Sequence, residues 1–325
     1  MSLMSAGPRR LLWMLTAIPA GGFGLAVASQ VPGPSATPAA LPGAGSDPGT
    51  ARPLPFFYDL YTFRAEGGRT TVVAAFAVEA GELETEPAGD NKRYRFSVTL
   101  VLADTAARSV TNRHDTVFVD LPRQLRDEHL IYTQIEVQAR PSSDIQQRVI
   151  MIDATTPGIG QLYWKYIRIP DYSGTELMLS DVALGQPGAQ SGWTRGAATL
   201  ALLPTSLFPS SAADLYYEIY NLPAGHPYTT EITIERLARN SNETVEDREP
   251  IRLRFAGQSA ADADGTLPEL RRVETSLANG RYRITVTISD LSTGRTASRS
   301  RTLEVHASGR GATLVPALPV TPRKG

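Results

Sequence analysis

The 325-residue chain contains no cysteine and very little lysine or histidine. Without cysteine it has no disulfides, no thiolate metal ligands, no cysteine nucleophile and no lipid-modified cysteine. Lysine occurs only at positions 92, 165 and 324, so arginine supplies nearly all the positive charge, and the arginines are spread along the chain. Since the net charge is −1, the composition does not favour binding to nucleic acid.

The sequence also lacks the motifs of common enzymes and metal sites. It has no GxSxG elbow, no P-loop and no Rossmann glycine fingerprint. Asp262-x-Asp264-Gly265 with Glu269 resembles part of a calcium loop, but an EF-hand needs more oxygen donors and a later glutamate, so we expect an acidic hairpin loop there. The four histidines lie far apart, without a second ligand at metal spacing: His114, His129, His226 and His306. The sequence therefore predicts no enzyme, no metal site and no cofactor.

The N-terminus has the parts of an export signal. Arg9 and Arg10 precede eighteen uncharged residues, 11–28, which end in Ala26-Val27-Ala28. A positive start, an apolar stretch and a small-x-small site are typical of a secretory signal. Two alternatives stay open: cleavage after Ala28, or retention of residues 11–28 as a membrane anchor, for which the length is near the lower limit. Both predict a periplasmic or extracytoplasmic protein.

The interior of the chain alternates with a period of two. In "KRYRFSVTLVLAD" every second residue from Tyr94 to Leu102 is apolar, as in a half-buried antiparallel strand. No segment has a helical stripe of twelve or more residues. Other strands are predicted at 70–78, 115–120, 130–139, 147–153, 162–169, 176–184, 199–203, 215–221, 228–237, 251–255, 281–290 and 295–305.

Composition divides the chain into segments. Residues 29–55 and 309–325 are rich in Pro, Ala and Gly, which predicts a flexible tether and a flexible tail. The Gly/Pro-rich stretch 184–197 predicts a domain boundary. We therefore expect an all-β protein with two consecutive antiparallel β-sandwich domains of immunoglobulin-like type, at 56–190 and 191–308.

Three motifs in the second half carry a family resemblance. "LMLSDVALG", "LYYEIYNL" and "NGRYRITVTISDLSTGRTASRSRTLEV" resemble the C-terminal half of bacterial GWxTD-domain proteins, in the same order and over residues 176–305. The Gly-Trp-x-Thr-Asp signature itself is absent, and the Gly192-Trp193-Thr194-Arg195 stretch is only similar to it. The resemblance implies an exported β-sandwich and no particular activity.

Aromatic rows on two predicted strands are the candidate binding residues. Tyr216, Glu218 and Tyr220 would share one strand face, opposite an apolar face, and Trp164 and Tyr166 form a similar row. Such a row is the outer face of a strand, a protein interface or a sugar platform. We take the outer face as our interpretation, with an interface as the main alternative. The candidate interface residues are Tyr216, Glu218, Tyr220, Trp164, Tyr166 and Trp193.

Together these patterns predict an exported, non-enzymatic scaffold or interaction protein of the cell envelope. Its expected partners are other envelope proteins or a respiratory, photosynthetic or secretion complex on whose periplasmic face it would pack as an extrinsic subunit. Residues 11–28 would supply any membrane contact. The competing hypothesis is a carbohydrate-binding β-sandwich module, which would need an exposed, coplanar aromatic row.

Overall fold

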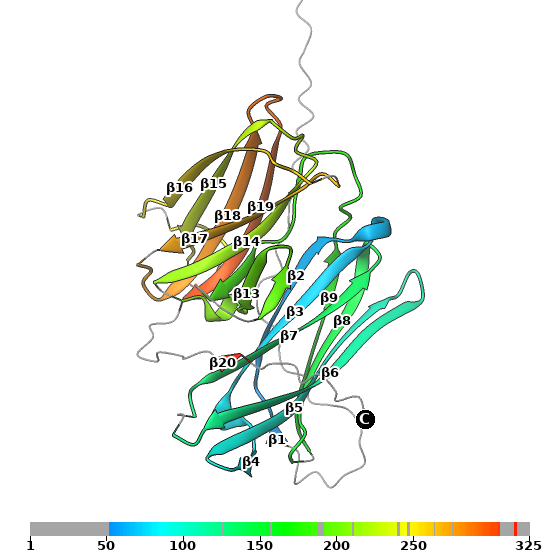
Figure 1. The fold of residues 1–325 in the computed structure, drawn as a ribbon, viewed down its shortest axis with the longest axis vertical. Coiled ribbons are helices and arrows are strands. Elements are labelled where there is room, and N and C mark those ends of the chain that lie inside the picture. Colours follow the sequence, from blue (N-terminus) through cyan, green and yellow to red (C-terminus); the bar gives the residue numbers. More distant parts are fainter. Residues whose placement is uncertain are drawn as a thin grey trace, which may run out of the picture. The chain divides into compact units, whose positions relative to one another are not determined.

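A computed structural model describes residues 52–305, without 125–126, 157, 187–191, 210, 239–240, 246–247, 263 and 275, together with residues 315–316. Over these residues the chain forms twenty β-strands and three short 3₁₀ helices, which confirms the predicted all-β class (Figure 1). Within the described part, no helix is long and apolar enough to cross a membrane. The predicted signal or anchor at 1–28 lies outside the described residues.

Two facing sheets form the N-terminal sandwich. The first sheet has the order β1-β9-β8-β5-β4, with β6 also paired to β5, and the second has the order β2-β3-β7-β20. The first sheet contains β1 (Arg52–Pro53), β4 (Thr85–Ala88), β5 (Asn91–Asp104), β6 (Ser109–Pro122), β8 (Ser142–Asp153) and β9 (Ile159–Ile169). The second contains β2 (Phe57–Arg64), β3 (Thr70–Glu79), β7 (Leu130–Ala139) and β20 (Val315–Pro316).

The core of this sandwich follows from the alternation in the sequence. Every second residue of β5 from Tyr94 to Leu102 is apolar and buried, and these residues pack with Phe76 of β3 and Ile135 of β7 from the facing sheet. The short helices η1 (Glu66–Gly68) and η2 (Ala80–Glu82) lie at the two ends of β3. Leu54, which we expected in the tether, is fully buried in this core, because β1 joins the sheet beside β9.

The C-terminal sandwich pairs a six-stranded sheet with a four-stranded one. The larger sheet has the order β10-β14-β11-β13-β12, with β17 on the other side of β14, and the smaller has the order β16-β15-β18-β19 (Figure 1). The larger sheet contains β10 (Met178–Leu179), β11 (Ala183–Gln186), β12 (Trp193–Arg195), β13 (Ala198–Leu202), β14 (Ala212–Tyr220) and β17 (Thr266–Glu274). The smaller contains β15 (Pro227–Arg236), β16 (Ile251–Gln258), β18 (Gly280–Asp290) and β19 (Thr296–Val305); η3 (Thr205–Leu207) follows β13.

The strand order moves the start of this sandwich upstream of the predicted boundary at 190. β10 and β11 both pair with β14, and β11 also pairs with β13. Two described glycines of the expected linker are packing positions: a Cβ on Gly185 would lie 2.7 Å from Leu200 Cδ2, and one on Gly192 would lie 2.2 Å from the Leu200 carbonyl oxygen. Glycine marks a close approach of strands here, which composition alone does not distinguish from a linker.

A third apolar cluster joins the two sandwiches. Tyr61 and Phe63 of β2 and Val73 and Ala75 of β3 turn away from their own core and pack with Trp193 and other residues of the C-terminal sandwich. The remaining members are Ala183, Ala198, Leu200, Leu202 and Tyr216. Strand β3 is consequently buried on both of its faces. Both sandwiches therefore belong to a single compact unit.

Candidate functional site, a buried polar seam

The densest group of charged side chains described in the structure lies where the two sandwiches meet. We call it the polar seam; it consists of three carboxylates and three arginines. Asp59 comes from β2, Asp181 from the turn between β10 and β11, Glu218 from β14, Arg195 from β12, and Arg299 and Arg301 from β19. Opposite charges are equal in number, so the seam is neutral as a whole.

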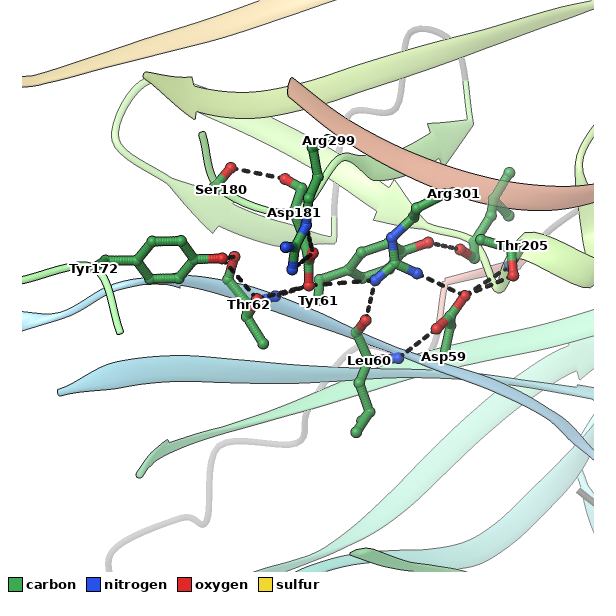
Figure 2. Close-up of polar contacts among 11 residues, drawn as sticks. Asp59, Leu60, Tyr61, Thr62, Tyr172, Ser180, Asp181, Thr205, Arg299 and Arg301 are labelled. Atoms are coloured by element: carbon green, nitrogen blue, oxygen red, sulfur yellow. Dashed lines mark hydrogen bonds and ion pairs between the residues drawn. The ribbon is translucent and has the colours of Figure 1, made fainter. Parts of the chain in front are cut away.

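Asp181 is the carboxylate at the centre of one half of the seam (Figure 2). Its Oδ2 accepts hydrogen bonds from the backbone nitrogen of Thr62, at 2.9 Å, and from the Thr62 hydroxyl, at 2.6 Å. Its Oδ1 accepts from Arg299 Nε at 2.6 Å, and Arg301 lies 3.4 Å from Oδ2. The Asp181 carboxylate is therefore held by groups from both sandwiches.

Arg301 connects Asp181 to the second carboxylate of this half. Its Nη1 lies 2.9 Å from Asp59 Oδ2, its Nη2 donates to the Leu60 carbonyl oxygen, and its guanidinium lies 4.3 Å from the ring centre of Tyr61 (Figure 2). Asp59 Oδ2 also accepts from the Thr205 hydroxyl at 2.6 Å. One arginine thus bridges a buried carboxylate, a half-buried carboxylate and a backbone oxygen.

Glu218 anchors the other half of the seam. Arg195 donates to both of its oxygens, at 2.5 and 3.0 Å, in the bidentate arrangement that gives arginine–carboxylate pairs their strength. The hydroxyls of Tyr216 and Tyr220 donate to the same two oxygens, at 2.7 and 2.6 Å. The backbone nitrogen of Glu218 donates to Ser180 Oγ, at 2.8 Å, next to Asp181 in the chain. The two halves are therefore continuous.

Burial and charge shift the pKa values in the seam in opposite directions. Burial by itself would raise the pKa of Asp181, but Arg299 and Arg301 hold it below its ordinary value. Burial would likewise raise the pKa of Asp59, and the charge of Arg301 lowers it. Burial and the charge of Glu218 both raise the pKa of Tyr220. The two aspartates are therefore ionised and the phenol protonated at neutral pH, which suits permanent hydrogen bonds rather than proton transfer.

The structure separates the candidate interface residues into two groups. Glu218, Tyr216, Tyr220 and Trp193 are at most 4% exposed, so the interpretation of the β14 row as an outer strand face is wrong. The row is an interface, but one inside the chain, and a carbohydrate could not reach it. Trp164 and Tyr166, on β9, are 44% and 57% exposed, and neither side chain belongs to the seam.

The sequence contains a signal for the seam arginines of β19, although these arginines were not among the predicted site residues. Arg299 pairs in register with Val286 and Arg301 with Ile284, and both of these β18 residues are fully buried. In "TASRSRTLEV" the two arginines therefore share the inward face with Leu303 and Val305. Because a cation on an inward face needs a partner, this pattern predicts buried carboxylates nearby. The identity of those carboxylates depends on the fold.

None of the six seam residues lines either of the two surface hollows of the described part of the structure, so these hollows offer no substrate site at the seam. Two hollows, of about 510 and 450 Å³, are lined by other residues: the first by Gly67, Gly68, Arg69, Arg140, Pro141 and Asp171, the second by residues of β6, β7 and β12 that include Trp193. Among the described residues, no three histidine or carboxylate side chains are grouped so as to hold a metal ion. The geometry is that of a structural interface in which ion pairs and hydrogen bonds hold the two sandwiches together.

Comparisons with known proteins place the chain in no family. No family model matches it, and no curated protein matches it, so the resemblance to GWxTD-domain proteins stays a prediction. Among solved structures, a calcium-binding mutant of Bacteroides uniformis β-glucuronidase 2 aligns over 76% of this chain and 28% of its own, with 9% identity and a TM-score of 0.24. Red sea bream transglutaminase aligns over 77% and 31%, with 13% identity and a TM-score of 0.18. The chain thus spans less than a third of these enzymes, and at such scores the likeness carries no argument about its activity.

Proposed function

We propose that this protein is an exported, non-enzymatic scaffold or interaction protein of the cell envelope, an extrinsic subunit packed on the periplasmic face of a membrane complex. The observation that carries the proposal is the polar seam. Its six charged groups form ion pairs with one another, and these pairs help to join the two sandwiches into one compact unit. Two joined sandwiches with a large outer surface suit a role in assembly.

The predicted export signal and tether support the location. A respiratory, photosynthetic or secretion complex would each present a periplasmic face of the required kind. The seam makes the protein a rigid spacer, because a relative movement of the sandwiches would separate buried charges that have no water to replace their partners.

Purification from native membranes in mild detergent, followed by mass spectrometry, tests the proposal. We expect the chain to be recovered with membrane-complex subunits in a fixed ratio, and the ratio to survive a salt wash at moderate ionic strength. Recovery of the chain alone from both the membrane and the soluble fraction, at its own mass, would contradict the proposal.

A carbohydrate-binding module is the second candidate, and the exposure of Trp164 and Tyr166 is the observation that favours it. Sugar rings stack on flat aromatic faces. The two ring planes, however, meet at 82°, so they do not form the coplanar row that a glycan chain needs. Glycan-array binding by the wild type that is lost in both Trp164→Ala and Tyr166→Ala, with unchanged folding, would favour this candidate over the scaffold.

A further inference from the structure

The outward surface of the first sheet collects most of the exposed apolar side chains in the described part of the chain. We call it the outer face; it consists of the outward positions of β5, β6, β8 and β9. In register, Tyr166 faces Gln146 and Trp164 faces Arg148, and these rows continue across β5 to β6. Five exposed large apolar residues lie on this face: Val110, Phe118, Ile152, Trp164 and Tyr166. Apolar side chains gathered on one sheet face indicate a contact surface.

Two arginines at the β8–β9 end of the outer face have no ion-pair partner among the described residues. Arg93 is neutralised by Asp120, at 2.7 Å, and Arg95 by Glu86 of β4, at 3.5 Å. Arg148 and Arg168 lie beside the aromatic pair, and neither forms an ion pair with a described residue; Arg148 donates to the neutral Gln146 at 2.9 Å. Two aromatic residues and two unneutralised cations therefore share this end of the face.

The undescribed N-terminal part of the chain ends beside the same strand. Arg52 pairs with Ile159 and Pro53 with Gly160, so the chain enters the fold at the start of β9. The Pro/Ala/Gly composition of residues 29–51 predicts a flexible tether, and a random coil of that length spans about 25 Å. β1, the first described strand after the predicted export segment 11–28, thus pairs with the strand that carries Trp164 and Tyr166.

We infer that the outer face, centred on Trp164, Tyr166, Arg148 and Arg168, docks on an anionic lipid surface. Tryptophan and tyrosine are enriched at the level of lipid headgroups, where one end of each ring is apolar and the other polar. Arginine binds headgroup phosphates through charge-assisted hydrogen bonds, and basic side chains are attracted to an anionic bilayer surface. The inference deepens the proposed function and rests on its extracytoplasmic location, because it names the surface that turns toward the membrane.

Quenching of tryptophan fluorescence by brominated lipids tests the inference on the full chain. A Trp13→Phe background leaves the exposed Trp164 and the buried Trp193, which serves as an unquenched baseline. With vesicles of brominated phosphatidylglycerol we expect at least twice the quenching found with brominated phosphatidylcholine, and its loss at about 1 M salt, where the Debye length is about 3 Å. Arg148→Gln with Arg168→Gln should remove the difference between the lipids.

A matched variant and two further outcomes make the test decisive. Arg252→Gln with Arg254→Gln removes the same charge from β16 of the other sandwich and should leave the quenching unchanged. Equal quenching by both lipids, or equal losses in the two double variants, would overturn the inference. So would sedimentation showing a dimer that Trp164→Ala dissociates, since the face would then bind a second copy. None of these quenching results changes the expected outcome of the purification from native membranes. The two experiments therefore test the lipid-docking inference and the scaffold proposal independently.

Discussion

The aromatic rows on β14 and β9 have the same alternating sequence pattern and opposite surroundings. Tyr216 and Tyr220 are almost fully buried and donate to Glu218, whereas Trp164 and Tyr166 are about half exposed. The first row is covered by Arg195 and by Phe63 from the other sandwich, and the second meets solvent. Alternation therefore defines the faces of a strand but not what covers them.

The residue types of the two rows do not separate them. In β14, "AADLYYEIY", one parity is apolar or aromatic, the other carries Asp214 and Glu218, and every residue after the first is buried. In β9 the exposed parity runs from Gly160 to Arg168 and is no more polar than the Glu218 parity of β14. β3, "TTVVAAFAVE", is apolar on both parities, which is typical of a strand with both faces covered, and it is buried on both faces.

The largest effect is expected from a fragment that uncovers the β14 row. A fragment of residues 192–308 lacks β11, which lies between β14 and β13 and bonds to both. We expect it to be unfolded by circular dichroism, contrary to the prediction of a boundary near 190. A fragment of residues 173–308 restores β10 and β11 and is the control. Cooperative unfolding of the shorter fragment would show that β11 is dispensable and the strand order wrong.

Glu218→Gln is expected to have the next largest effect. The substitution keeps the shape but leaves Arg195 without its bidentate carboxylate in a buried site, which costs about 3 kcal/mol of unfolding free energy. On an exposed strand face the same change would cost almost nothing. Urea denaturation measures it. The matched control is Glu231→Gln, because the Glu231–Arg254 pair is exposed and its loss should leave the free energy of unfolding almost unchanged.

Acid should weaken the seam while it leaves the β9 row unchanged. The pKa values of Asp59 and Asp181 lie below the ordinary 3.8 in the folded protein, so their contribution to stability is complete above pH 4 and is lost as the pH falls through the folded values. Burial would raise the pKa of Asp290, but hydrogen bonds from Thr293 and His226 lower it to about 2. Asp290 therefore also loses its charge as the pH falls in this acidic range.

Thermal unfolding between pH 7 and pH 2 checks this prediction. The melting temperature should fall steeply below pH 4, and Asp181→Asn should be less stable at pH 7 and less dependent on pH, because one of the titrating groups is gone. Asp59 and Asp290 contribute to the remaining slope, together with the exposed aspartates whose pKa values are also lowered: Asp104, Asp120 and Asp171. An unchanged slope in Asp181→Asn would mean that the Asp181 carboxylate is not held ionised by Arg299 and Arg301.

The sequence predicted the strands much better than it predicted their partners. Alternation located the buried residues of β5 and β18, because it depends only on neighbouring positions along one strand. The seam depends on residues such as Asp59 and Arg301, which lie far apart in the chain and meet only because β2 and β19 do. The short β12 was missed because glycine-rich sequence around it indicates a linker, although its Trp193 is buried. Pairings of this kind are set by tertiary packing.

The smallest effect is expected from the exposed row. Trp164 and Tyr166 touch edge to face, with ring centres 6.1 Å apart, and both are open to solvent. Trp164→Ala and Tyr166→Ala should therefore each lower the unfolding free energy by less than about 1 kcal/mol, the value of one aromatic contact.

Trp193→Ala is the matched change in the buried group. Its ring stacks on Phe63 at 5.0 Å and its Nε1 donates to Glu136 at 3.1 Å, so its loss should cost about 3–5 kcal/mol. Urea denaturation of the three variants compares the exposed β9 row with a buried aromatic residue of the cluster that packs against the β14 row. If Trp164→Ala cost as much as Trp193→Ala, the β9 row would be covered in the folded protein. The outer face would then be unavailable to a membrane, and the contrast between the rows would vanish.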